Sequence, residues 1–229
     1  YSEGRFPQAR AEYERSLRRA RPRARPGIHT DLGRINFFTG DMEKAVEHFT
    51  AASAELAKRE KRALVVVYES KALTEYSLGA VYEKMGNTAA AQEAYGRALQ
   101  EDLAFAPAHR ALSNLALARG DTATTLSEMA LAVELSPKDA ALRMDYGLML
   151  LLARKPAEGV AEIQKAAELE PLFAAPQLML ARLYDNSKLP VEALEHYRTY
   201  LARAARDDAG YAAAQARAAA LEAELKAAS

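Results

Sequence analysis

Apolar residues recur at intervals of three and four along almost the whole chain, and short polar turns interrupt them at regular distances. This spacing places the apolar residues on one face of a helix, whereas a strand would alternate them. Successive turns are 34 residues apart in the second half of the chain. The pattern therefore predicts helix pairs repeated with a fixed period, and the aligned turn positions are Gly40, Gly86, Gly120, Arg154 and Lys188.

Small residues stand at fixed places within each predicted pair. Because large side chains bury more apolar surface, small ones at regular positions indicate helix backbones that pass close together. Thr125 and Gly159 interrupt one row of alanines, and Tyr200 interrupts the other, so the last repeat is atypical. The small residues are Gly33, Gly79, Ser113, Gly147 and Ala181 on the first helices, and Ala45, Ala91, Ala193, Ala52, Ala98, Ala132 and Ala166 on the second.

Together these residues resemble the tetratricopeptide repeat family over nearly all of residues 1–205. The resemblance implies an all-α fold, a right-handed α-solenoid of stacked helix-turn-helix repeats with a C-terminal capping helix. It also implies that the small residues lie where the first helix of a repeat crosses the second. In this family the first helices line a concave groove that holds an extended peptide or a helix of another protein.

The period divides the chain into seven segments. Gly4 already stands in a turn, so we expect the first helix of that repeat to precede residue 1. The segments are a partial first repeat with only its second helix (1–26), four repeats (27–71, 72–105, 106–139 and 140–173), a last, atypical repeat (174–206) and a capping helix (207–229).

One repeat is longer than the others. Gly40 and Gly86 are 46 residues apart, about three helical turns more than the period. The surplus lies in a segment that has no glycine or proline and is rich in helix-forming residues. We therefore expect residues 55–72 to form a helical hairpin that protrudes from the stack.

Composition narrows the classes of function. The chain has no cysteine, which excludes disulfides and thiolate metal sites. Its longest apolar run, Tyr146 to Ala153, is too short to span a membrane.

The net charge is zero, but residues 1–62 hold 14 Lys and Arg against 9 Asp and Glu, and the remainder holds 17 against 22. This asymmetry favours head-to-tail contact in a homo-oligomer over nucleic-acid binding, which calls for a basic domain.

Catalytic signatures are absent from the sequence: it has no phosphate-binding glycine loop, no nucleophile elbow and no paired metal-binding histidines. The four histidines occupy two repeat-equivalent positions, His29 with His109 and His48 with His196. Because the histidines recur at equivalent positions of the repeat, a packing role is favoured over metal ligation. We therefore expect no enzymatic activity, no metal and no cofactor.

The resemblance assigns a row of residues to the concave groove. Arg110 and Asn114 resemble half of the clamp that some relatives use on carboxylates, but Asp145 stands where that clamp needs an amide and would repel a carboxylate. We therefore expect no such clamp, and instead a hydrophobic peptide or amphipathic helix on an apolar row. The alternative for this apolar row is that several of its residues pack against the next repeat. The predicted partner-binding residues are Tyr76, Arg110, Asn114, Met144, Leu148, Leu152, Leu178 and Arg182, with Thr30, Arg34, Phe37, Phe38, Ala80, Leu117 and Leu151 beside them.

Two basic runs, at residues 15–25 and 58–62, form a second candidate surface. Both lie near the ends of predicted second helices, where cations complement the helix dipole and stay solvated. The alternative is an edge that binds an anionic partner, although neither run contains an aromatic residue to stack on a base. The residues of this edge are Arg18, Arg19, Arg59 and Arg62.

The sequence thus predicts a protein-protein interaction scaffold, with assembly of an envelope, pilus or secretion complex as its setting by analogy of fold. An alternative is the regulatory or substrate-recruiting arm of an enzyme whose catalytic domain lies outside these residues. A further alternative is a self-assembling structural subunit. The usage of Ala and Arg indicates a bacterial source, and it leaves both the cytoplasm and the periplasm open.

Overall fold

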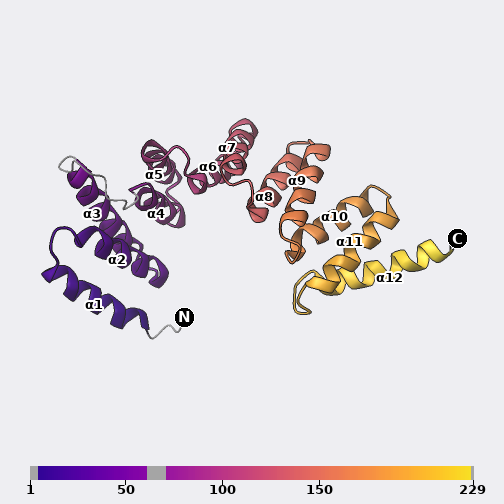
Figure 1. Cartoon of the computed structure of the whole chain (residues 1–229), viewed down its shortest axis with the longest axis horizontal. Coiled ribbons are helices and arrows are strands. Elements are labelled where there is room, and N and C mark those ends of the chain that lie inside the picture. The colour runs from indigo at the N-terminus through magenta and orange to yellow at the C-terminus, as the bar shows by residue number, and fades with distance from the viewer. Residues whose placement is uncertain (1–4, 61–70, 228–229) are drawn as a thin grey trace. The chain divides into compact units, whose positions relative to one another are not determined.

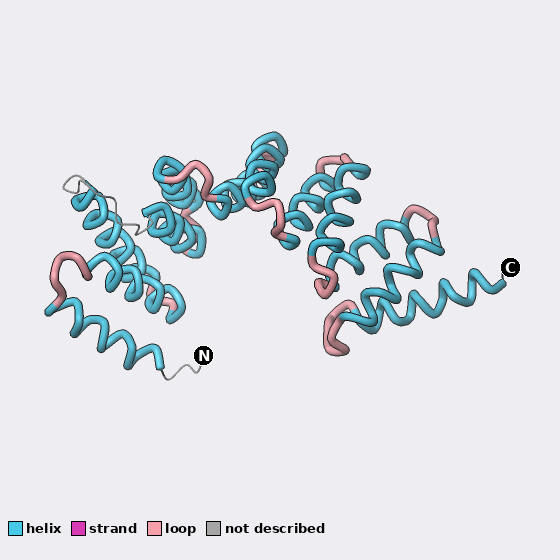
Figure 2. The backbone as a smooth tube through the Cα atoms, in the orientation of Figure 1, coloured by secondary structure: helices cyan, strands magenta, loops and turns pink. Residues whose placement is uncertain are grey.

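The computed structural model of the chain describes residues 5–60 and 71–227, and these residues form twelve α-helices and no strand (Figures 1 and 2). The all-α class expected from the sequence is therefore confirmed for this part of the chain. The helices are α1 (Phe6–Arg19), α2 (Arg25–Thr39), α3 (Met42–Glu60), α4 (Lys71–Lys84), α5 (Thr88–Glu101), α6 (Ala106–Ala118), α7 (Thr122–Leu135), α8 (Ala140–Leu152), α9 (Pro156–Leu169), α10 (Ala174–Asn186), α11 (Pro190–Arg203) and α12 (Tyr211–Ala227).

The helices group into two compact units. Unit 1, residues 1–120, contains α1 to α6, and unit 2, residues 121–229, contains α7 to α12. Within unit 1 the pairs α2–α3 and α4–α5 pack most closely, and within unit 2 the pairs α8–α9 and α10–α11 do. The predicted repeat of residues 106–139 spans the boundary between the units, so its helices α6 and α7 belong to different units.

The small residues lie where paired helices meet, as the sequence predicts. A Cβ atom on Gly79 of α4 would stand 2.5 Å from the ring of Tyr95 on α5, and one on Gly33 of α2 would stand 2.9 Å from the ring of Phe49 on α3. Ala91 is fully buried and joins a cluster with Tyr95, Ala111 and Leu115, which brings α6 onto the same pair. Small side chains therefore allow three helices to pack together at this point.

The predicted inter-helix turns share one backbone conformation. All five aligned positions have positive φ, including Arg154 (60°) and Lys188 (62°), where glycine would be the ordinary residue. In the turn after α8, the N–H of Lys155 donates to the carbonyl of Leu150 at 2.9 Å, and the turns after α2, α4 and α10 have the equivalent bond. This hydrogen bond ends the helix through a residue in the left-handed conformation. The turns at Arg154 and Lys188 therefore keep the geometry of the glycine turns.

Arg154→Gly is expected to raise the free energy of unfolding by about 0.5–1 kcal/mol, because glycine adopts positive φ without the cost that a Cβ atom brings. Urea denaturation followed by circular dichroism measures the change. Gly40→Ala is the matched reverse variant: φ at Gly40 is 85°, and a Cβ there would meet no atom within 4 Å. It should lose stability by a similar amount, and equal stability of both variants with the parent chain would refute the turn geometry.

The predicted helical hairpin lies mostly outside the described residues. Helix α3 continues to Glu60 and α4 begins at Lys71, so both flanks of the surplus segment are helical. Residues 61–70, which contain most of the surplus, are not described. The protruding hairpin therefore stays a prediction.

Helix α12 covers the end of unit 2, as expected of a capping helix. Its Ala214, Ala218 and Leu221 are buried against Tyr197 and Tyr200 of α11. The guanidinium of Arg217 donates through Nε and Nη2 to both carboxylate oxygens of Asp185 on α10, each at 2.8 Å. These hydrogen bonds lower the pKa of Asp185. The apolar stripe of α12 is thus used for packing, and a bidentate ion pair orients the helix.

Candidate functional site: the unit 1 groove

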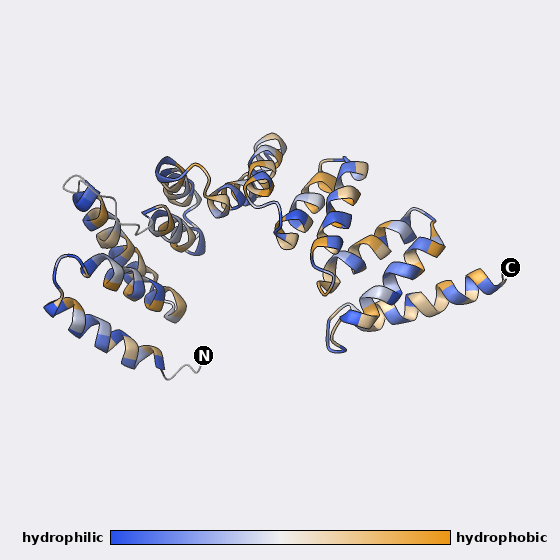
Figure 3. Ribbon diagram, in the orientation of Figure 1, coloured by the Kyte–Doolittle hydropathy of each residue, from blue (hydrophilic) through white to orange (hydrophobic). Residues whose placement is uncertain are grey.

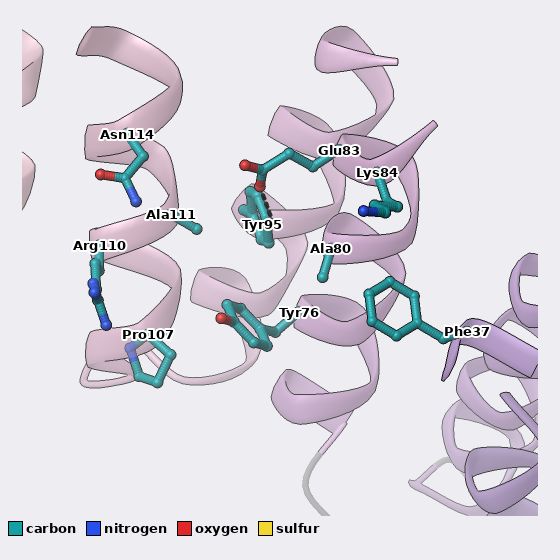
Figure 4. Close-up of a pocket in the computed structure, with 10 residues that line it drawn as sticks. All are labelled: Phe37, Tyr76, Ala80, Glu83, Lys84, Tyr95, Pro107, Arg110, Ala111 and Asn114. Carbon is teal, nitrogen blue, oxygen red and sulfur yellow. Dashed lines mark hydrogen bonds between the residues drawn. The ribbon is translucent and has the colours of Figure 1, made fainter. Parts of the chain in front are cut away.

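A groove of about 420 Å³, here called the unit 1 groove, lies in unit 1. Four helices contribute to it, and all of them belong to the same unit (Figure 4). Its lining residues are Phe37 from α2, Tyr76, Ala80, Glu83 and Lys84 from α4, Tyr95 from α5, and Pro107, Arg110, Ala111 and Asn114 from α6.

Helical periodicity explains how two helices each contribute several residues to this groove. On α4 the lining residues follow Tyr76 at intervals of four, seven and eight, and on α6 they follow Pro107 at intervals of three, four and seven. Residues with these spacings share one face of a helix. Figure 4 shows the two faces on either side of the groove, with Tyr95 between them.

Aromatic rings form the apolar part of the groove. The ring of Tyr76 lies 5.5 Å from that of Tyr95 and 5.6 Å from that of Phe105, the second contact being edge-to-face. These distances are within the favourable range for aromatic pairs, so Tyr76 is held in place from two sides. Ala80 and Ala111 add only methyl groups and leave room between the two helices. The groove can therefore accept an apolar side chain against a rigid surface.

Polar groups stand at the edges of the groove. The hydroxyl of Tyr95 donates to Oε2 of Glu83 at 2.7 Å. Burial and this hydrogen bond raise the pKa of Tyr95 far above its usual range, so the hydroxyl stays protonated and remains a donor. Lys84 is exposed on α4, and Arg110 and Asn114 are exposed on α6. The edges of the groove thus carry two cations, one amide and the Glu83 carboxylate that accepts from Tyr95.

The structure brings together only part of the predicted row. Tyr76, Arg110 and Asn114 line the unit 1 groove, together with Phe37 and Ala80. Sequence reasoning missed Glu83, Lys84, Tyr95, Pro107 and Ala111 as lining residues. Glu83 and Lys84 could have been found, because they lie seven and eight positions after Tyr76 on the same helical face. Tyr95 could not, because its place in the repeat pattern marks it as core.

Thr30, Arg34, Phe38 and Leu117, also predicted, lie on α2 and α6 of unit 1 but do not line the groove. The remaining predicted residues belong to unit 2, on α8 and α10. Leu152 is 70% exposed, whereas Met144 and Leu148 are half-buried. Leu178 packs against the core cluster of α11 and α12, and Arg182 is exposed on the same helix. Part of the apolar row of unit 2 therefore packs in the core, as Leu178 does, and part is exposed, with Leu152 its most exposed member.

The two basic runs meet within unit 1. The guanidinium of Arg59, in the last turn of α3, donates to the carbonyl oxygen of Arg23, which lies between α1 and α2. Arg18 and Arg19 are exposed in the last turn of α1. Figure 3 shows α1 as a largely hydrophilic helix. Arg62 lies outside the described residues, so three of the four predicted residues of this edge can be placed.

Neither a metal site nor a membrane-spanning helix is found in the described part of the chain. Within residues 5–60 and 71–227, no three acidic or histidine side chains gather in a way that could hold a metal ion. Over the same ranges, none of the helices combines the length and the hydropathy needed to cross a bilayer.

Sequence comparison identifies the repeat unit. Residues 76–105, which include the end of α4 facing the groove and all of α5, match the family model described as tetratricopeptide repeat. The chain contains the tetratricopeptide repeat. No curated protein matches the chain in sequence.

Solved structures of tetratricopeptide-repeat proteins share its fold. The C-terminal part of a repeat-containing protein from Cytophaga hutchinsonii has a TM-score of 0.71 at 14% identity and covers 93% of this chain and 80% of its own. PilF of Pseudomonas aeruginosa has a TM-score of 0.67 at 18% identity, covering 90% and 92%. YrrB, described as a tetratricopeptide-repeat protein with an unusual peptide-binding site, has a TM-score of 0.61 at 16% identity, covering 89% and 97%. At these identities the likeness shows the fold.

Proposed function

We propose that this tetratricopeptide-repeat chain is a non-catalytic interaction scaffold whose unit 1 groove holds a segment of a partner protein. The observation that supports it is the groove itself: a rigid aromatic surface with Lys84 and Arg110 on its two sides. Such a surface suits an extended peptide or one face of an amphipathic helix. The peptide-binding site of YrrB is a property of that protein, and it makes peptide binding a reasonable function for this fold.

The chemistry of the groove favours an acidic partner segment. An apolar side chain of the partner would lie on Tyr76 between Ala80 and Ala111, where burial contributes roughly 1.5–3 kcal/mol. A carboxylate beside it would face Lys84 or Arg110, and the amide of Asn114 can pair with the peptide backbone. We infer that assembly of an envelope, pilus or secretion complex is the setting, an inference that rests on fold alone.

The test selects peptides from a displayed random library on the folded chain and measures their affinity by fluorescence polarisation. We expect the selected peptides to place Asp or Glu beside an apolar residue. The double variant Lys84→Glu with Arg110→Glu should weaken their binding about tenfold or more. Each of the two ion pairs in the parent complex contributes about 0.2–1 kcal/mol, and in the variant each becomes a repulsion. Binding should also weaken as salt screens the charges.

Two matched variants locate the binding surface. Lys138→Glu with Arg206→Glu makes the same change of charge at exposed positions of unit 2 and should leave affinity unchanged. Leu152→Ser removes the most exposed apolar residue of the alternative row on α8. If Leu152→Ser abolishes binding and the groove variant does not, the partner binds unit 2 and the proposal for the unit 1 groove is wrong.

A further inference from the structure

A polar contact joins the first helix of a repeat to its second helix at one recurrent position. In three repeats the two side chains are nineteen residues apart in the sequence, one on each helix of the pair. In the repeat of α4 and α5, Ala94 stands at the second position, and Glu75 instead accepts from Nε of Arg97 at 2.8 Å. The three pairs are His29–His48 at 3.1 Å, Arg143–Glu162 at 2.7 Å and Gln177–His196 at 2.7 Å.

His29–His48 is the pair in which both members are histidines, the residue type whose ordinary pKa is nearest to neutral pH. Their Nδ1 atoms are 3.1 Å apart, and their ring centroids are 5.3 Å apart. That centroid distance is close to the sum of the nitrogen separation and two ring radii, so the two nitrogens point at each other almost head-on. A metal ion held by both nitrogens would need them to point at a common third position. The geometry is that of one N–H···N hydrogen bond, in which one imidazole donates and the other accepts.

We propose that His29 and His48 form a pH-responsive contact that holds α2 on α3 when both rings are neutral and loosens that pairing when both are protonated. The first added proton binds Nε2 of the donor ring, so Nδ1 of the other ring still accepts and the hydrogen bond is kept. A second proton leaves two N–H groups and two positive charges facing each other, with no acceptor between them. The contact therefore changes from attraction to repulsion over the range in which histidine titrates.

The surroundings of the pair bear both signs of charge. His29 faces Glu47 and Glu55 of α3 and Arg25 of its own helix. His48 faces Glu14 of α1, with Glu47 and Lys44 beside it on α3. The carboxylates favour uptake of a proton, yet burial outweighs them and lowers the pKa of both imidazoles, and the facing His29 lowers the pKa of His48 further.

The direction of the pH effect follows from those shifts. Because the folded chain binds protons less readily than the unfolded chain at these two sites, the contact contributes its full stability above about pH 6.5, the ordinary histidine value. That contribution decreases as the pH falls below it. Helix α2 also supplies Phe37 to the unit 1 groove, so acidification would weaken partner binding as well, a consequence that rests on the proposed function.

The chain itself provides the variants for a test. His29→Gln installs in α2–α3 the Gln–His pair that α10 and α11 already accommodate at 2.7 Å, so this variant should fold. Gln177→His makes the reciprocal change and installs a His–His pair in unit 2. Both are measured by thermal unfolding from about pH 7.5 to about pH 5.5, on either side of the ordinary pKa of histidine.

The parent chain should lose unfolding temperature on acidification, and His29→Gln should lose less by about 3–5 °C, because only one imidazole of the pair is left to take up a proton. Gln177→His should lose more than the parent. In nitrogen-15 spectra of the imidazoles, His29 and His48 should titrate in two separated steps, and His48 in a single step in His29→Gln. His196, which faces the amide of Gln177 and not a second imidazole, should titrate in a single step in the same spectra and is the reference.

These measurements need no binding partner, so they fail or succeed independently of the unit 1 groove. Identical pH dependence of the parent chain and His29→Gln would overturn the proposal, as would single-step titration of both histidines in the parent chain. Stabilisation of the parent by micromolar Zn²⁺ that is lost in His29→Gln would also overturn it, because the pair would then be a metal site.

Discussion

Gly147→Ala is expected to lower the free energy of unfolding of unit 2 by about 2–3 kcal/mol. A Cβ atom at this position of α8 would stand 2.6 Å from Cγ1 of Ile163 and 2.8 Å from the carbonyl oxygen of Gly159, both on α9. The oxygen belongs to a helix backbone, and Ile163 is fully buried, so neither can move aside without separating the two helices. Overpacking of this kind outweighs the gain in helix propensity that alanine brings.

Thermal unfolding followed by circular dichroism measures this effect, since each kcal/mol lowers the midpoint of a domain of about this size by about 4 °C or more. Gly96→Ala is the matched control. Gly96 also lies within a helix, α5, but a Cβ there would meet no atom within 4 Å. It should therefore gain about 0.5–1 kcal/mol from propensity alone. A Gly147→Ala variant that is as stable as Gly96→Ala would contradict the close contact of α8 with α9.

Leu221→Ala is expected to cost about 2–5 kcal/mol of stability, the range for a buried leucine that leaves a cavity. Leu221 is 1% exposed and lies on α12 within the cluster that includes Tyr197 and Tyr200 of α11. The loss should be large because the neighbouring buried residues of α12, Ala214 and Ala218, are too small to fill the space. The same unfolding measurement detects it.

This variant tests whether α12 is an integral part of unit 2. Gln215→Ala changes an exposed residue of the same helix and should leave the free energy of unfolding within about 0.5 kcal/mol of that of the parent chain. If Leu221→Ala behaves like Gln215→Ala, then α12 does not pack on α11 in solution, and the capping role inferred from its apolar stripe is wrong.

Several features follow from the sequence by itself. The interval between turns located all five left-handed positions, including Arg154 and Lys188, which no glycine marks. The rows of small residues located the helix crossings, as at Gly79 and Tyr95. Both succeed for the same reason: a repeated unit places each residue in the same local environment many times, so a position is recognised by its period even where its residue type varies.

Part of the site could also be predicted in this way. Tyr76, Arg110 and Asn114 line the unit 1 groove because one face of each first helix is assigned by its register in the repeat. Lys84 and Glu83 were missed, although they share that face, because they stand at the polar end of the helix. Periodicity identifies a face, but it does not say how far along the helix a groove extends.

Other features were decided only by the tertiary structure. Gly159 interrupts the alanine row in sequence, yet in the structure it is the position where a Cβ would meet the carbonyl oxygen of Gly147 at 2.8 Å. His29 and His48 look like two separate repeat positions, and only the crossing of α2 with α3 places their Nδ1 atoms 3.1 Å apart. Which side chains touch depends on the distance and angle between two helices, and side-chain packing across the interface sets both. The period of a sequence carries no information on this distance and angle.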